Sequence, residues 1–324
     1  MNPPSLPMNL VGPTQTLQGF GHWPETSHVF AEDDIRAINM ALASGRPLLL
    51  RGEPGCGKSQ LARAAAEMLE WPLLARVVNG RCEPEDLLYR FDAVARLAKA
   101  QILPKTDEAM KELAAEHFLL PEILWWALNP ENAAQRYHDS IKHCGAIACD
   151  YGKETRYPFA EDKGCVVLID EIDKADSEVP NSLLEAFSLG GFGLPYGGGS
   201  VTAKGVKSPL IIVTTNEDRE LPPAFVRRCL VHQMDPPKDG LKAYFGGRAR
   251  AHFPDKTELS DDVLGEAIGR LIEDRALMKS QDLPQPGLAE LLDLLRAVVA
   301  MGKGTDLEEM KSFVSFAFRK HRLD

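Results

Sequence analysis

A short glycine-rich stretch has the residue types and the spacing needed to hold a polyphosphate. Residues 52–59 fill the pattern G-x-x-x-x-G-K-[ST], in which glycines let the backbone turn tightly and aim successive N–H groups at phosphate oxygens. The lysine of this pattern reaches the β- and γ-phosphates, and its Ser hydroxyl ligates Mg²⁺. The predicted nucleotide-binding residues are this loop and the residue after it: Gly52, Glu53, Pro54, Gly55, Cys56, Gly57, Lys58, Ser59 and Gln60.

The residues on either side of this loop predict the strand and the helix that the motif requires. Residues 47–50 form a short apolar run suited to a buried parallel strand. After the loop, Leu61, Ala64 and Met68 recur at helical spacing. The loop then precedes a helix N-terminus, where unpaired N–H groups and the helix dipole favour bound phosphate. A chance match in a glycine-containing turn is the alternative, and this context argues against it.

Two carboxylates follow another apolar run and could complete a metal-assisted phosphate site. Residues 165–169 are apolar, and Asp170 and Glu171 come directly after them. Ligands of parallel sheets gather at the carboxyl ends of the strands, so Asp170 is predicted to hold Mg²⁺ together with Ser59. Glu171 is predicted to polarise the attacking water. The alternative, a charged loop start formed by Glu171 and Asp173, is disfavoured because the same chain carries a complete phosphate loop.

Three further apolar runs complete the strands of a predicted parallel sheet. Residues 73–78, 209–215 and 229–234 are read as strands. The second run is followed by Asn216, whose amide can orient water or contact a γ-phosphate. We therefore predict that Asn216 belongs to the same site as the phosphate loop.

Length and composition indicate an ordinary globular protein. The chain has 324 residues, of which 44% are hydrophobic and 26% charged, and this length predicts a main domain plus a smaller one. The formal net charge of -10 disfavours a general basic surface for nucleic acid, although a local basic patch stays open. No apolar run approaches the roughly 18 residues of a membrane helix, and no signal peptide is evident. Because six cysteines in a chain of this length suit a reducing compartment, we expect a cytoplasmic protein.

Outside the predicted strands, the pattern of the chain changes from segment to segment. Residues 1–29 are rich in proline and lack periodicity, which predicts an arm or loop over the surface. Residues 79–164 are the least regular and contain helix-like stretches at 107–118 and 121–128. From about residue 240 onward, the apolar residues recur at helical spacing and predict a smaller helical domain.

Two clusters in the irregular segment admit more than one interpretation. The adjacent Trp125 and Trp126 are predicted to lie in a local core, because tryptophan is highly buried on average, with a partner-binding anchor as the alternative. A nearby set of histidines and cysteines fits no common zinc spacing and is read as structural or exposed: His138, His143, Cys144 and Cys149.

Taken together, these motifs resemble those of an AAA+ ATPase and, within that superfamily, the MoxR group. The resemblance covers most of the chain and rests on the order of the phosphate loop, residues 168–171, a glycine-rich hairpin after residues 183–186, residues 214–216, and residues 221–228. It implies an α/β fold, with a five-stranded parallel αβα core of strand order 5-1-4-3-2 and a smaller helical lid. It also implies ATP and Mg²⁺ as cofactors and a homo-oligomer, usually a six-membered ring, with ATP between neighbouring subunits.

The resemblance also implies domain boundaries. An N-terminal arm at 1–29 precedes a nucleotide-binding core at 30–236, and a helical lid domain follows at 237–324. The phosphate loop and Asp170 are further apart than a minimal core requires, so a largely helical insertion is expected at about 91–163.

Two roles at the nucleotide are carried over from the resemblance. Asn216 is the expected sensor 1 residue, and Arg227 or Arg228 is the expected arginine finger, which would reach the nucleotide of the next subunit. Both arginines follow Asn216 at a distance too short for both to fold back over their own phosphate loop. The predicted catalytic residues are Glu171, Asn216, Arg227 and Arg228.

The lid departs from the family pattern at the position of its sensor 2 arginine. MoxR-type lids often carry this arginine near the start of a late helix, but residues 285–290 contain none. If the lid contacts ATP through an arginine, another residue must replace the missing sensor 2 arginine. Arg270 and Arg275 are the candidates.

The leading functional prediction is an ATP hydrolase that remodels a protein partner. MoxR-like proteins often work with proteins carrying a von Willebrand A domain, so the resemblance points to such a partner. The main alternative is a nucleic-acid motor, for which Lys204 and Lys207 near the hairpin are the only favourable feature. A nucleotide-dependent regulatory switch is a further alternative, but the intact Asp170 and Glu171 argue against it.

Overall fold

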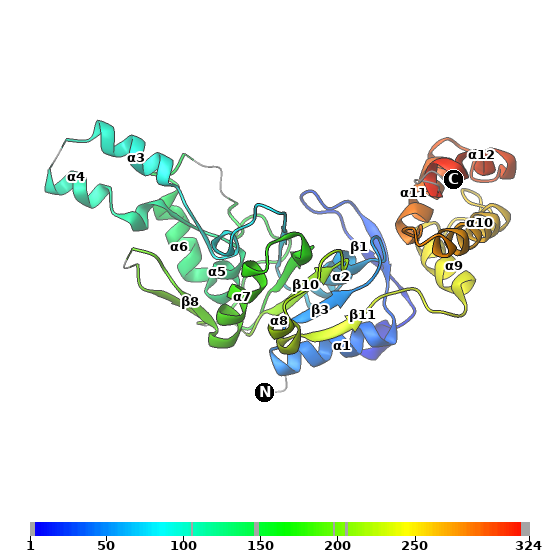
Figure 1. Cartoon of the computed structure of the whole chain (residues 1–324), viewed down its shortest axis with the longest axis horizontal. Coiled ribbons are helices and arrows are strands. Elements are labelled where there is room, and N and C mark those ends of the chain that lie inside the picture. The colour runs from blue at the N-terminus through cyan, green and yellow to red at the C-terminus, as the bar shows by residue number, and fades with distance from the viewer. Residues whose placement is uncertain (1–3, 105, 146–148, 197, 205–206, 319–324) are drawn as a thin grey trace.

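A five-stranded parallel sheet forms the centre of the computed structural model (Figure 1). The structure describes residues 4–104, 106–145, 149–196, 198–204 and 207–318. The strands are β3 (Leu48–Arg51), β4 (Leu73–Val77), β7 (Val166–Asp170), β10 (Leu210–Thr215) and β11 (Leu230–Gln233). Their order across the sheet is β11-β3-β10-β7-β4. Counted along the chain this order is 5-1-4-3-2, so the expected core topology is confirmed.

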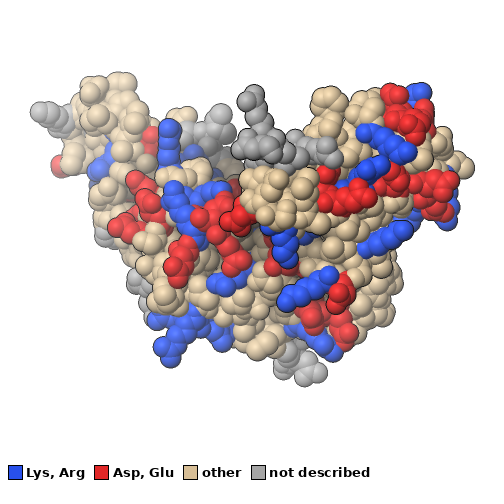
Figure 2. All heavy atoms as spheres, turned by 45° about the vertical axis from the view of Figure 1, so that its right-hand side comes forward, with Lys and Arg blue, Asp and Glu red and all other residues tan. Residues whose placement is uncertain are grey.

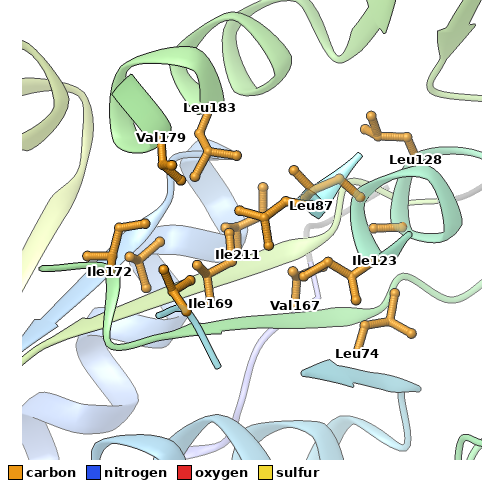
Figure 3. Packing of buried hydrophobic residues seen from close by; sticks show 14 of the residues in the cluster. Leu74, Leu87, Ile123, Leu128, Val167, Ile169, Ile172, Val179, Leu183 and Ile211 are labelled. Carbon is orange, nitrogen blue, oxygen red and sulfur yellow. The ribbon is translucent and has the colours of Figure 1, made fainter. Parts of the chain in front are cut away.

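Alternate residues of these strands belong to two different layers of the core. Leu48 and Leu50 of β3 pack on one side of the sheet, and Leu49 packs on the other. Figure 3 shows this second layer, in which Ile169 and Ile211 lie near the covering helices. Because both faces are covered, each strand needs a continuous apolar run. The covering helices are α1 (Glu32–Ser44) and α2 (Lys58–Leu69) on the first side, and α5 (Ile123–Leu128), α7 (Glu178–Leu189) and α8 (Pro223–Arg228) on the second.

The N-terminal segment is more regular than the sequence indicated. A short 3-10 helix (Met8–Leu10) precedes β1 (Thr14–Leu17), which pairs antiparallel with β2 (Thr26–Val29). The buried side chains of Leu6 and Leu17 anchor the segment on the same core layer as α1 and α2. The sequence predicted an arm or loop over the surface and did not reveal this hairpin, because two four-residue strands separated by a loop leave too short a pattern to recognise.

The segment between β4 and β7 is mainly helical but also contains a small hairpin. Strand β5 (Tyr89–Phe91) pairs antiparallel with β6 (Leu119–Pro121). The single helix expected at 107–118 is instead divided into an α-helix at Asp107–Glu112 and a 3-10 helix at Ala115–Phe118. The helices α3 (Ala93–Ile102) and α4 (Asp107–Glu112), which lie between these two strands in the chain, project away from the sheet at one end of the molecule (Figure 1). The other elements are the helix α6 (Pro130–Ser140) and the 3-10 helices at Pro84–Leu87 and Ala115–Phe118.

The adjacent tryptophans of α5 are core residues. Trp125 and Trp126 are both fully buried. The indole Nε1 of Trp125 donates a hydrogen bond to Asn132 Oδ1 at 2.8 Å, and the Trp126 ring lies near Phe159 and Tyr151. The prediction of a buried pair is therefore confirmed, and their use as an exposed anchor for a partner is excluded.

The C-terminal helices have a core of their own. Phe245, Leu271, Leu295 and Met310 belong to one buried cluster that contains no residue of the sheet. The helices are α9 (Leu241–His252), α10 (Asp261–Ser280), α11 (Leu288–Ala300) and α12 (Leu307–Phe318). Within the described part of the chain, no helix is long and apolar enough to cross a membrane.

Two small elements complete the fold near the sheet. A glycine-rich hairpin, β8 (Gly191–Gly193) paired antiparallel with β9 (Ser200–Thr202), follows α7. A 3-10 helix at Ile172–Lys174 follows β7. The hairpin expected in the glycine-rich stretch is therefore present.

Candidate active site

The predicted phosphate loop connects β3 to the N-terminus of α2. Three of its glycines have backbone torsions that other residues rarely adopt, with φ of 146° at Gly52, 75° at Gly55 and 104° at Gly57. Since Gly57 is the residue before α2 and Lys58 begins the helix, the loop delivers the helix N-terminus and its free N–H groups to the site.

Lys58 is held inside the loop by hydrogen bonds to oxygen atoms of residues that follow β3 and β10. Its Nζ donates to the carbonyls of Gly52 at 2.7 Å and Glu53 at 3.0 Å. It also donates to Oδ1 of Asn216, which follows β10, at 2.7 Å. The side chain is almost fully buried, so its charge acts where solvent screening is weak. Two sequence-predicted residues, Lys58 and Asn216, are thereby brought into direct contact.

Asp170 at the end of β7 joins the phosphate loop to the neighbouring strand. Ser59 Oγ lies 2.9 Å from Oδ1 and 2.8 Å from Oδ2 of Asp170. Thr214 Oγ1 donates to Oδ1 of Asp170 at 2.5 Å and accepts a hydrogen bond from the Glu171 backbone N–H at 2.9 Å. This cluster of hydroxyl and carboxylate oxygens has the chemistry that Mg²⁺ prefers, so the residues present fit the ion.

Glu171 has an unusual backbone conformation at the centre of this group. Its φ of 59° lies in the left-handed region, which is unfavourable for a residue with a side chain. Oε1 of Glu171 lies 3.5 Å from Nδ2 of Asn216. Strained backbone often persists where surrounding structure holds a functional side chain. The Glu171 carboxylate thus lies beside Asn216, which in turn bonds to Lys58.

A cavity of about 350 Å³ opens beside these residues, which is within the size range of small-molecule sites. The phosphate loop, Asp170, Glu171 and Asn216 form its floor, and residues 26–29 of β2 form a wall. Residues of the lid helices α9 and α11 also line the cavity. The N-terminal hairpin and the lid thus enclose a pocket over the phosphate loop.

Several cavity residues had no signal in the sequence. Arg248 and His252 of α9, Arg296 of α11 and His28 of β2 line the cavity, but each belongs to an element without a motif. Burial lowers the pKa of His28 and of His252 to about 4, so both imidazoles are neutral near pH 7. Thr214 was also missed as a site residue, because only Asn216 of the stretch 214–216 was expected to act at the nucleotide, whereas Thr214 bonds to Asp170 and Glu171.

Arg227 and Arg228 are not among the described residues that line this cavity. Both are exposed at the C-terminal end of α8. Arg46, which follows α1, donates from Nη2 to the carbonyl of Arg227 at 2.7 Å and from Nε to that of Arg228 at 3.0 Å. A third bond from Nη2 reaches the carbonyl of Cys229 at 3.1 Å. The pair is therefore fixed by its backbone while its side chains face outward.

The two candidate substitutes for a sensor 2 arginine have other partners. Arg270 is on the exposed side of α10 and pairs with Glu266 and Glu273. Arg275, also on α10, is buried and pairs with Glu53 of the phosphate loop. Among the described residues that line the cavity, neither arginine is present.

The parallel sheet of order 5-1-4-3-2, with its phosphate loop after the first strand and carboxylates after the third, defines an AAA+ ATPase. Residues 47–229 match the family model of the AAA domain, dynein-related subfamily, which is more than half of the chain. The chain belongs to this family. It is accordingly a nucleotide-binding protein and an ATP hydrolase.

Two solved structures that match this chain are only distantly similar to it in sequence. A crystal structure of a proposed ATPase from Cytophaga hutchinsonii is 13% identical, with a TM-score of 0.36, and the match covers 88% of this chain and 80% of that one. NtrX from Brucella abortus in complex with ADP is 12% identical, with a TM-score of 0.43, over 85% of this chain and 50% of that one. No curated protein matches the chain in sequence. The family assignment rests on the family model and the sheet order alone.

Proposed function

We propose that this ATPase binds Mg-ATP in the cavity between its phosphate loop and its lid. The observation that carries the proposal is the contact network at the strand ends, where Lys58 bonds to Asn216 and Ser59 to Asp170. Ser59 and Asp170 are the residues that would hold Mg²⁺, and the bound ion would neutralise phosphate charge. Lys58 binds the β- and γ-phosphates, and the loop N–H groups of residues 52–60 surround the polyphosphate.

Glu171 is the proposed base for the attacking water. A positioned carboxylate accepts the proton of a nucleophile during general base catalysis. Asn216, which lies near both Glu171 and Lys58, would orient that water between the carboxylate and the phosphate. Because Asn216 contacts the cation that binds phosphate, it is also suited to report whether a γ-phosphate is present.

We further propose that neighbouring subunits share each site in a homo-oligomeric ring, six-membered as is usual for such proteins. Arg227 and Arg228 are exposed, are fixed through Arg46, and are not among the described residues that line the cavity of their own subunit. A planar guanidinium suits the charge of a transferring phosphoryl group. An outward-facing arginine can supply this charge to the nucleotide of an adjacent subunit.

The domain boundaries are part of the same proposal. We assign residues 30–236 to the nucleotide-binding core, with an insertion at about 91–163, and residues 237–324 to the lid. The separate buried cluster of residues 245–318 supports this division. Residues 1–29 act with the core, since β2 lines the cavity.

We propose that this ATPase remodels a protein partner, as proteins of the MoxR group do. The resemblance favours a protein with a von Willebrand A domain as that partner. The projecting helices α3 and α4 support a protein-binding role, because Val94, Leu97 and Ile102 are 80%, 63% and 83% exposed. Exposed apolar side chains that gather on one element commonly mark interaction sites. On the face drawn in Figure 2, Lys and Arg alternate with Asp and Glu, which does not favour a nucleic-acid track on that face.

We expect the double substitution Val94→Ser and Leu97→Ser to abolish partner stimulation while basal ATPase activity is retained. Both residues lie on α3, outside the cavity, so the loss of apolar area affects docking only. The measurement captures proteins from the native host with a Glu171→Gln variant in ATP, then assays ATPase activity with each purified candidate. Met40→Ser is the matched control, since Met40 is an exposed apolar residue of α1.

The expected partner stimulates the wild-type protein and the Met40→Ser control but not the double variant. Equal stimulation of all three proteins would place the docking surface elsewhere. Stimulation by DNA or RNA, with no effect of any captured protein, would favour the nucleic-acid motor instead.

A further inference from the structure

Arg275 connects the lid directly to the phosphate loop. Its Nη1 donates to Glu53 Oε2 and its Nη2 to Glu53 Oε1, both at 2.9 Å. This bidentate arrangement, with two parallel hydrogen bonds, is the strong form of an arginine–carboxylate pair. The Arg275 side chain is 8% exposed and that of Glu53 is 28% exposed. The pair is therefore well shielded, and removing one partner would leave a charge in a poorly solvated place.

Both partners of this pair are fixed by further contacts. Nη1 of Arg275 also donates to the carbonyl of Pro286, in the segment that connects α10 to α11, at 2.7 Å. The carbonyl of Glu53 accepts from Lys58 Nζ at 3.0 Å, and its backbone N–H donates to Asp235 Oδ1 at 3.0 Å. A chain of contacts thus runs from a lid helix through one loop residue to the lysine that binds phosphate.

A second contact between the lid and the loop lies next to the first. A Cβ atom added at Gly55 would lie 2.6 Å from Cβ of Ala289, in the first turn of α11. Such a distance is below any ordinary van der Waals contact. The backbone of the loop and the start of α11 are therefore packed together. A side chain at this position of the loop would not fit without displacing this part of the lid.

We propose that Arg275 is a positioning residue that sets the shape of the phosphate loop through Glu53 and so couples lid placement to nucleotide binding. It does this without contacting the nucleotide. Its donors are directed to Glu53 and Pro286, and it is not among the described residues that line the cavity. This inference rests on the proposed nucleotide site, and it separates Arg275 from the direct role of a sensor 2 arginine.

The test is a double-mutant cycle on nucleotide affinity, measured with a fluorescent ADP analogue. Arg275→Ala and Glu53→Ala should each weaken binding by about tenfold or more, within the usual range of coupling between sites. The double variant should lose no more than either single variant, because both changes remove one interaction. The exchanged pair, Glu53→Arg with Arg275→Glu, should recover part of the loss. Arg270→Ala is the matched control, since Arg270 is on the same helix with exposed partners.

Distinct outcomes separate the failure of this inference from that of the nucleotide site. If the wild-type protein does not bind the analogue, or Lys58→Ala binds it normally, the nucleotide site itself is wrong. The inference is overturned if Arg275→Ala weakens analogue binding while Glu53→Ala does not, or if the double variant loses as much affinity as the two single variants combined. In either case Arg275 acts on the nucleotide directly. Normal binding by both single variants also overturns it. If a thermal melt shows that Arg275→Ala is not folded, Arg275→Lys replaces it in the cycle. Lysine keeps the positive charge but cannot make the bidentate contact with Glu53.

Discussion

The Glu171→Gln variant is expected to bind ATP normally and to hydrolyse it about 10² to 10⁴ times more slowly, the usual contribution of a general base. Glutamine keeps the shape of the side chain and its contact with Asn216 but cannot accept a proton at neutral pH. The backbone of Glu171 is held by Thr214, so the substitution should leave the site's geometry unchanged. The measurement compares equilibrium binding of ATP with turnover under saturating ATP.

Lys58→Ala gives the contrasting result. Lys58 is bonded to two loop carbonyls and to Asn216, and we propose that its ammonium is the charge within the loop that binds phosphate. Its removal should therefore abolish ATP binding as well as turnover. If Glu171→Gln lost affinity as completely as Lys58→Ala, or hydrolysed ATP at the normal rate, Glu171 would not be the residue that activates water.

The second large effect is expected at the exposed arginines of α8. An arginine finger contributes roughly 10³ to 10⁵ in rate, or about 4 to 7 kcal/mol of barrier. We expect Arg227→Ala or Arg228→Ala to bind ATP, since neither residue lines the cavity of its own subunit, yet to be nearly inactive. Arg36→Ala is the control, because Arg36 is an exposed arginine of α1 that pairs with Glu32.

These arginine variants are compared by ATP affinity and by turnover at a fixed protein concentration. The variant that retains affinity and loses turnover identifies the finger. Full turnover by both single variants would exclude a finger at either position. Loss of ATP affinity in both would instead indicate that α8 supports the fold of the site.

The phosphate loop and the acidic strand end could be predicted from the sequence because their chemistry depends on local spacing. The motif fixes the relation of Gly52, Lys58 and Ser59 within one loop, and the buried strand before Asp170 has a continuous apolar run. The strand order could not be derived from the residues. It came from the resemblance, because which strands become neighbours depends on packing across the whole core.

The residues that were missed are those whose role depends on tertiary contacts alone. Arg296 is distant from the loop in sequence and reaches the cavity only because α11 packs over it. Arg275 was considered as a candidate for direct sensing, but its partner Glu53 is distant in sequence, and no pattern connects the two. The N-terminal hairpin was missed for a related reason. Its strands are too short to show a period, and its wall of the cavity exists only after the chain folds.

If ATP is cleaved at a site shared by two subunits, mixing two inactive variants should restore activity. Lys58→Ala has an intact finger, and the inactive arginine variant has an intact phosphate loop. A mixed interface can therefore regain a complete site. Lys58→Ala mixed with Glu171→Gln is the control, because both changes affect the subunit that supplies the loop.

We predict that the first mixture recovers a measurable fraction of wild-type turnover while the control mixture stays inactive. Wild-type turnover per subunit should also fall when the protein is diluted until it dissociates. No recovery in a mixture that is shown to form mixed oligomers, or turnover per subunit that is unchanged down to the monomer, would contradict the shared site.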